Sequence, residues 1–136
     1  MKKLERKFII MLIADELYAM PLLKDGKFID YNQLNILPVP NTNSKIIGLI
    51  YSEGKIITVL DTAKILNLSK NKNNLLFIFD YNDDIYGLTI QGSGEIIKVD
   101  KILVDNKRKK FKKYIKQKNK KMYILNIEDI FNEIKK

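Results

Sequence analysis

The sequence predicts an all-β fold, a small antiparallel barrel or sandwich, arranged in two lobes. Short apolar or β-branched runs of strand length recur along the chain, and polar or glycine-containing turns separate them about every ten residues. Only two short segments have helical spacing instead. With 136 residues, the chain can bury a core of its own without disulfides or a structural metal.

The first lobe is expected over residues 8–70 and begins with a hairpin. Asp15-Glu16 separates two apolar runs and can form a tight turn between them. Pro21 has no amide hydrogen, so its strand either lies at a sheet edge or ends there. Further along, Gly54 lies in a four-residue turn between two β-branched runs. The strands predicted for this lobe cover residues 8–13, 17–23, 46–51 and 55–60.

A short helix and a polar connector are expected to end the first lobe. Asp61 or Thr62 can cap a helix over residues 63–68. The polar segment 69–74 follows, and it is the strongest candidate for a lobe boundary in the chain.

The second lobe is expected over residues 75–136, where the strand pattern restarts. A turn at 81–84 and a glycine-containing break at 91–94 separate its strands. Apolar residues spaced i, i+3, i+4 and i+7 predict an amphipathic helix over 127–134. The strands predicted for this lobe cover residues 75–79, 85–90, 95–99 and 122–125.

The composition excludes several kinds of site. The chain has no His and no Cys, which excludes a Ser-His triad, a His-ligated or Cys-ligated zinc and a disulfide framework. The acidic pairs lie at predicted turns or at a helix start, and they do not form a catalytic constellation. We therefore expect no catalytic residues, no metal and no cofactor.

The N-terminal apolar run is not expected to direct secretion. It covers residues 8–14, near the lower length limit of a signal peptide core, and Asp15-Glu16 follows where small residues should precede cleavage. No apolar stretch approaches the length of a membrane span. A cytoplasmic location is the expectation.

The chain is basic, with 25 Lys and Arg against 16 Asp and Glu, a net charge of +9. Lys107–Lys121 contains ten of these basic residues, with Phe111, Tyr114 and Ile115 at helical spacing. The favoured interpretation is a solvated connector whose three apolar residues dock on the barrel. Two alternatives stay open: a site for nucleic acid, with bases stacked on the aromatic rings, and a surface for anionic lipid or another acidic partner.

One long segment resembles a known family. The stretch VPN…IIGLIYSEGKIITVLDTAKILNL is similar to the signature of CheW-like chemotaxis coupling proteins. The opening hairpin with Tyr18, the second-lobe hairpin with Gly87 and Gly92, and the closing strand and helix resemble the same family in the same order, so the likeness covers nearly the whole chain. The matching positions of the signature are Pro40, Asn41, Gly48, Gly54, Ile56, Val59 and Asp61.

The resemblance implies two five-stranded SH3-like barrels packed side by side, in an adaptor that performs no chemistry. Such adaptors join the cytoplasmic tips of chemoreceptors to the regulatory domain of the histidine kinase CheA. Glu53 is the expected polar contact with the kinase. Pro40, Asn41, Gly48, Gly54, Asp61 and Gly87 are expected to shape scaffold turns. The expected receptor groove between the lobes is formed by Leu22, Leu23, Phe28, Ile90 and Gly92.

The sequence departs from the family at these contact positions. The family's Asn-Leu-Arg-Gly turn is Tyr51-Ser52-Glu53-Gly54 here, so an interface arginine becomes acidic. Asp25-Gly26-Lys27 replaces an apolar and an acidic residue on the receptor-facing strand, and Thr58 replaces a proline. Because a buried contact between like charges costs several kcal/mol, partners of other family members should fit poorly unless they have changed as well.

Overall fold

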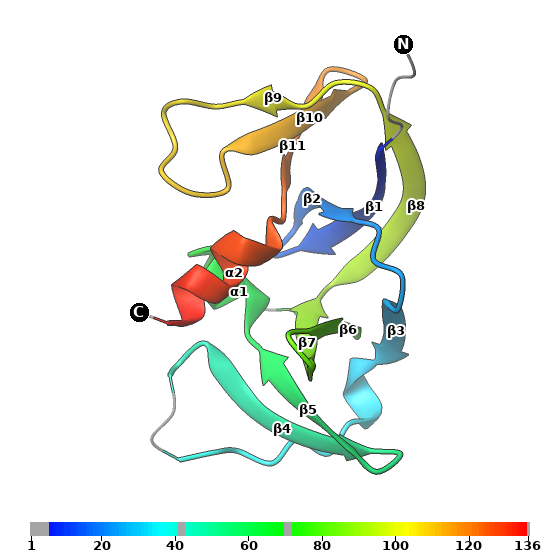
Figure 1. The fold of residues 1–136 in the computed structure, drawn as a ribbon, viewed down its shortest axis with the longest axis vertical. Helices are drawn as coiled ribbons and strands as arrows, with labels where there is room; N and C mark the ends of the chain where they lie inside the picture. Colours follow the sequence, from blue (N-terminus) through cyan, green and yellow to red (C-terminus); the bar gives the residue numbers. More distant parts are fainter. Residues whose placement is uncertain (1–5, 41–42, 70–71, 136) are drawn as a thin grey trace. The chain divides into compact units, whose positions relative to one another are not determined.

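The structure is a computed structural model that describes residues 6–40, 43–69 and 72–135 (Figure 1). The described chain is mainly strand, in one sheet of six strands and one of five. Its contacts divide it into two compact units that do not follow chain order. Unit 1 contains the chain up to Leu12, Glu16–Leu22 and everything from Ser93 onward, and unit 2 contains Ile13–Asp15 and Leu23–Gly92.

Unit 1 is built on the six-stranded sheet, in the order β8-β1-β2-β11-β10-β9. The last strand in chain order, β11, runs parallel to β2, with Tyr123 beside Tyr18. One cluster of buried residues in this sheet consists of Phe8, Ile10, Ala19, Ile97, Ile115, Met122 and Ile124. The elements are β1 Arg6–Ile13, β2 Glu16–Pro21, β8 Gly92–Val99, β9 Leu103–Val104, β10 Lys113–Gln117, β11 Lys120–Ile124 and α2 Ile127–Ile134.

Unit 2 is built on the five-stranded sheet, in the order β3-β6-β7-β5-β4. Here β5 and β7 are the parallel pair, with Val59 beside Gly87. The core cluster consists of Ile50, Ile57, Val59, Leu76 and Ile78. The elements are β3 Lys27–Asp30, the 3-10 turn η1 Tyr31–Gln33, β4 Ile46–Ser52, β5 Lys55–Leu60, α1 Thr62–Ile65, β6 Leu75–Tyr81 and β7 Asp84–Ile90.

Four hairpins share one turn geometry. In each, two residues with positive φ link the strands, as a type I′ turn requires. This turn twists in the same sense as the strands it connects. The hairpins therefore reverse tightly, although only one of the eight turn residues is a glycine. The turns are Ala14-Asp15, Glu53-Gly54, Asn82-Asp83 and Lys118-Asn119.

The predicted lobe boundary at residues 69–74 is wrong. Strand β5 before this connector pairs with β7 after it, and β3 pairs with β6, so both sides belong to unit 2. Unit 1 instead joins the N-terminal hairpin to the C-terminal strands. A polar connector shows only that the chain leaves a strand, and it carries no information about which strands pair across it.

Most predicted elements agree with the structure, with four differences. Helix α1 ends at Ile65, shorter than predicted. Strand β8 starts at Gly92, inside the predicted break. Strands β3, β9 and β10 and the turn η1 were not predicted. Strand β3 and η1 lie in a mixed segment, and lysines obscured the alternation of β10. Leu22 and Leu23 lie beyond the end of β2, which stops at Pro21.

Candidate partner-binding surfaces

The tip of the β4–β5 hairpin is a defined, exposed feature of unit 2. Glu53 and Gly54 have φ of 51° and 76°, and a Cβ at Gly54 would meet nothing within 4 Å. Backbone conformation therefore explains this glycine, because the left-handed region disfavours other residues. Beside the turn, Tyr51 and Ile56 face each other across the strands and are 69% and 49% exposed. The tip thus presents one carboxylate next to an exposed apolar pair.

Gly48 fixes the base of the same hairpin through a close backbone approach. Leu37 and Leu49 exchange two backbone hydrogen bonds of 2.8 Å, which brings residues 36–37 across β4. A Cβ at Gly48 would lie 2.3 Å from the Leu37 carbonyl oxygen, and no other residue fits there without moving the backbone. Strand β4 also has a register shift between Ile46 and Gly48.

Asp61 holds the end of β5 to the start of α1. Its side chain is the helix N-cap and accepts a hydrogen bond from the Lys64 amide at 3.2 Å. Its own amide donates to the Lys45 carbonyl at 2.8 Å. Next to it, Thr89 Oγ1 accepts from the Thr62 amide and donates to the Leu60 carbonyl, both at 3.1 Å. A buried carboxylate is stable here because it is hydrogen-bonded.

The residues predicted to shape scaffold turns occupy different kinds of position in the structure. Gly54 lies in a turn and Asp61 caps a helix, whereas Gly48 and Gly87 lie inside β4 and β7 and are not turn residues. Gly87 is needed because the Leu76 side chain occupies the space of its missing Cβ, 2.7 Å away. Pro40 lies in a turn, and Asn41 lies outside the described residues.

The predicted groove residues have different environments. Leu22 belongs to unit 1 and is 46% exposed, and Gly92 is half-buried at the start of β8. Leu23 and Phe28 are half-buried in unit 2, where the Phe28 ring lies 5.0 Å from that of Phe77. Ile90 is fully buried, so the prediction that it is an available groove anchor is wrong: the residue belongs to the core.

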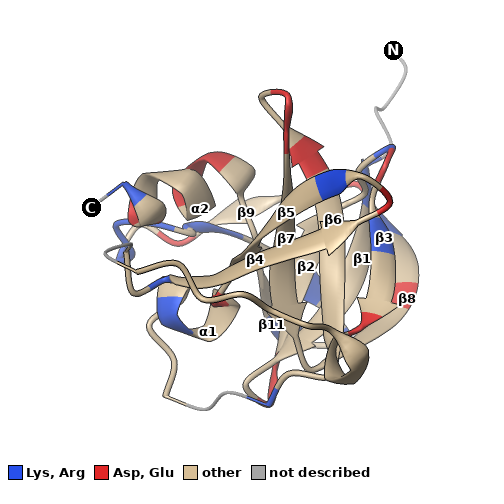
Figure 2. Cartoon of the chain, turned by 90° about the horizontal axis from the view of Figure 1, so that it is seen from below, with Lys and Arg blue, Asp and Glu red and all other residues tan. Residues whose placement is uncertain are grey.

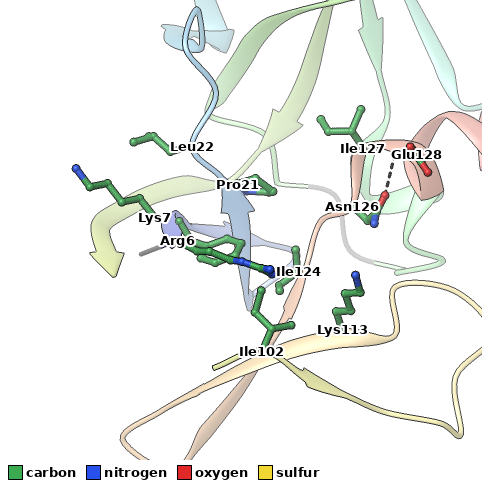
Figure 3. Close-up of a pocket in the computed structure, with 11 residues that line it drawn as sticks. Arg6, Lys7, Pro21, Leu22, Ile102, Lys113, Ile124, Asn126, Ile127 and Glu128 are labelled. Carbon is green, nitrogen blue, oxygen red and sulfur yellow. Dashed lines mark hydrogen bonds between the residues drawn. The ribbon is translucent and has the colours of Figure 1, made fainter. Parts of the chain in front are cut away.

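A pocket of about 490 Å3 opens on unit 1 (Figure 3). Its apolar lining consists of Phe8, Pro21, Leu22, Ile102, Ile124 and Ile127. Its polar rim consists of Arg6, Lys7, Lys113, Asn126 and Glu128. Asn126 is oriented by its role as the N-cap of α2, accepting from the amides of Glu128 and Asp129 at 2.9 and 3.3 Å. We call this feature the unit 1 pocket.

Sequence reasoning missed the rim of the unit 1 pocket, although it selected Leu22. Arg6 and Lys7 precede the apolar run that marked the first strand. Lys113 belongs to β10, and its position two residues before the buried Ile115, on the same face of the strand, was the available signal. Parallel pairing of β2 with β11 brings these distant segments into one sheet, and no sequence spacing shows that.

Two apolar residues of the lysine-rich run are buried in unit 1, as predicted, but the run is not a connector, because it contains strand β10 and the start of β11. Phe111 is 2% exposed and Ile115 is fully buried. Tyr114 is paired with Tyr123 across β10 and β11. The two rings are already covered by cations, Lys121 at 4.3 Å from the Tyr114 centroid and Arg108 at 3.7 Å from the Tyr123 centroid. Rings covered in this way are poorly placed to stack on bases.

Two hydrogen-bonded groups in the same sheet have shifted pKa values. The Tyr123 hydroxyl donates to Asp105 at 2.7 Å. This bond, helped by the Lys107 amide, holds the pKa of Asp105 below its usual range. Burial, together with a hydrogen bond to Glu16, raises the pKa of Tyr18 above its usual range. Both groups are engaged in structural contacts, and neither is arranged for proton transfer to a substrate.

In the described part of the chain, no group of three acidic residues could hold a metal ion. No described helix has the length and apolar character of a bilayer-spanning segment. What the described residues offer are exposed apolar pairs, charged rims and rigid turns, which are features of a protein-binding scaffold.

Comparison with known proteins shows to which family this scaffold-like chain belongs. The model of the CheW-like domain matches residues 7–135, and the chain therefore belongs to the CheW-like family, a family of scaffold and adaptor proteins. The scaffolding protein TtCheW from Thermoanaerobacter tengcongensis has the same fold, with a TM-score of 0.80 and 23% identity over 94% of this chain and 93% of that chain. The comparison with curated proteins gave no match. The predicted all-β fold of two SH3-like lobes is confirmed.

Proposed function

We propose that this protein is a cytoplasmic coupling scaffold that joins the tip of a chemoreceptor to the regulatory domain of a CheA-type histidine kinase. Membership of the CheW-like family over residues 7–135 supports this proposal. The observation that carries it is the hairpin tip, where a tight turn presents Glu53 beside the exposed Tyr51–Ile56 pair. The signature segment of the family thus includes an exposed hairpin whose base is held by backbone hydrogen bonds to Leu37.

The hairpin suits a binding role because it needs little ordering on association. Its turn has the geometry that matches strand twist, and Gly48 lets residues 36–37 bridge its base. An interface that is rigid beforehand loses less conformational entropy when it binds. The apolar pair supplies buried area, and Glu53 selects a partner with a basic group opposite it.

The receptor contact is proposed for the remaining predicted residues Leu22, Leu23, Phe28 and Gly92, without Ile90. The exposed or half-buried state of these four residues is compatible with contact to a helix. Burying one such leucine at an interface contributes about 1.5–3 kcal/mol. Leu23→Ala should therefore weaken receptor binding at least tenfold, while Leu37→Ala, an exposed residue of the same unit, leaves it unchanged.

The kinase contact is tested by calorimetry with the purified regulatory domain of a kinase encoded in the same genome. Glu53→Arg should weaken binding at least tenfold, equivalent to about 1.4 kcal/mol. The matched control is Asp83→Arg, which changes the same charge at another type I′ turn of unit 2. Equal losses for both variants would show a general charge effect, and absence of binding by the unmodified protein would overturn the proposal.

A further inference from the structure

The excess positive charge of the protein is confined to one unit. Unit 1 contains 18 of the 25 basic residues and 8 of the 16 acidic residues, a net charge of +10, whereas unit 2 contains 7 basic and 8 acidic residues, a net charge of −1. A general bias toward lysine in the composition would enrich both units. The difference instead indicates that the charge of unit 1 serves a purpose of its own.

The unit 1 pocket combines this charge with an apolar lining. Figure 3 shows the side chains of Arg6 and Lys113 directed toward the middle of the pocket, while Lys7 extends away from it. Leu22 remains 46% exposed at the edge. Glu128 is the one acidic residue among those that line this pocket. A ligand here would bury apolar surface and meet positive charge within the same small area.

A second hollow of about 290 Å3 adjoins the first and shares Lys113, Ile124 and Asn126 with it. It adds Lys109 and Lys112, both exposed, to the basic rim. Its charges are only partly neutralised within unit 1. Lys110 pairs with the buried Glu133, and Asp129 accepts a hydrogen bond from the Phe111 amide at 3.0 Å. Lys113 thus lies at the centre of a basic strip that runs along two hollows.

We propose that the unit 1 pocket binds an acidic, amphipathic peptide segment of a partner protein. One or two aliphatic side chains of the segment occupy the pocket beside Leu22 and Ile127. Flanking carboxylates reach Arg6 and Lys113 on the rim and continue toward Lys112. The proposal rests on the proposed scaffold function only in taking the partner to be a protein, and it adds the chemistry that the partner must have.

Two other acidic partners fit the structure less well. A single-stranded nucleic acid that stacks its bases would need free aromatic faces, but Arg108 and Lys121 already cover Tyr123 and Tyr114. Lysine also offers phosphates a point charge without the bidentate geometry of arginine. An anionic membrane presents a broad surface with its headgroups outermost, whereas the apolar contact here lies in a recessed pocket. A peptide side chain can reach that lining.

The proposal is tested with a labelled 16-residue helical peptide that has leucines on one face and glutamates flanking them. Fluorescence anisotropy should show micromolar binding that weakens as salt is raised, because exposed charges are screened. Lys113→Glu should reduce affinity at least tenfold. Lys116→Glu is the matched control, since it makes the same charge change on the same strand but alternates to the face opposite the buried Ile115, and it should stay within threefold.

The apolar half of the site has its own pair of variants. Leu22→Ser should weaken the peptide at least fivefold, while Leu37→Ser, an equally exposed leucine of unit 2, should not. Thermal melts of all four variants show whether each is folded. Equal losses for Lys113→Glu and Lys116→Glu, equal binding of a peptide with lysines in place of glutamates, or tighter Lys113-dependent binding of a 16-mer oligonucleotide or of phosphatidylserine vesicles would overturn the proposal. Leu22 also belongs to the proposed receptor contact, so the Lys113→Glu variant separates the two proposals: it should lose the peptide while its kinase binding, measured through Glu53, and its receptor binding, measured through Leu23, stay unchanged.

Discussion

The two units of this protein are built on similar sheets, but they differ in net charge and in how closely their backbone segments approach. Unit 2 is nearly neutral and contains the close approaches that define the frame, at Gly48 and Gly87. Unit 1 has a net charge of +10, a loop rich in lysine and the pocket described above. In Figure 2 the acidic residues of α2 appear as red segments.

The comparison explains why the family is recognisable from one unit more than from the other. The signature segment lies in unit 2, where backbone contact, positive φ and helix capping restrict which residues can be present. Surface charge is not restricted by packing, so unit 1 can diverge in its contacts while its buried residues keep the fold. Within the signature segment of unit 2, the glycines and Asp61 shape the backbone, whereas the exposed Glu53 is the proposed partner contact.

The largest expected effect tests whether the lysine-rich run is part of the core of unit 1. Phe111 is 2% exposed, and Phe111→Ala should lower the free energy of unfolding by about 3–5 kcal/mol through lost burial and a cavity. Lys109→Ala, two residues away and exposed, should change it by less than about 0.5 kcal/mol. Urea denaturation measures both. A loss below 1 kcal/mol for Phe111→Ala would mean that the run is not docked on the core of unit 1.

The second-largest expected effect is a difference in stability between Gly→Ala substitutions in the two units. Gly48→Ala places a methyl group 2.3 Å from the Leu37 carbonyl oxygen, and such overpacking costs about 1–3 kcal/mol. In unit 1, a Cβ at Gly94 would have its nearest neighbour, Ile10, at an ordinary 3.4 Å, so Gly94→Ala should be nearly neutral. Similar melting temperatures for the two variants would contradict the view that unit 2 has the tighter frame.

The helix caps provide a smaller contrast. Asp61 is buried and caps α1, while Asn126 is half-buried and caps α2. Asp61→Ala should cost about 2 kcal/mol and Asn126→Ala about 1 kcal/mol, the upper and middle parts of the range for lost N-caps. Chemical denaturation of both variants measures the difference. The reverse order would show that burial does not set the strength of these caps.

The smallest expected effect is a change in one pKa in unit 1. Tyr123→Phe removes the hydroxyl that donates to Asp105, so the pKa of Asp105 should rise toward its ordinary value, as followed by NMR titration. Because the pKa is lowered in the folded state, the linked stabilisation is present at neutral pH and is lost as pH falls through the lowered pKa. Tyr114→Phe, its cross-strand neighbour, should leave the Asp105 pKa unchanged.

The sequence was sufficient for most of the local structure and for the family, and insufficient for strands β3, β9 and β10 and for long-range pairing. Alternation and turn residues located the β4–β5 hairpin and helix α2 to within a residue. The lobe boundary failed because the pairing of β5 with β7 and of β2 with β11 is set by tertiary packing. The prediction that Ile90 is exposed was wrong, because a β-branched residue in a strand gives the same sequence pattern whether it lies in a core or in a groove. The rim of the unit 1 pocket was missed because its residues are more than 100 positions apart in sequence, from Arg6 to Lys113.

The most direct test of the account is whether the protein binds its two partners at the same time. The regulatory domain of the kinase is titrated by calorimetry into the protein alone and into the protein saturated with the receptor fragment. A coupling scaffold predicts one kinase domain bound per chain in both titrations, with affinities that agree within about threefold. Loss of kinase binding in the presence of receptor, or displacement of the receptor by the kinase, would contradict it.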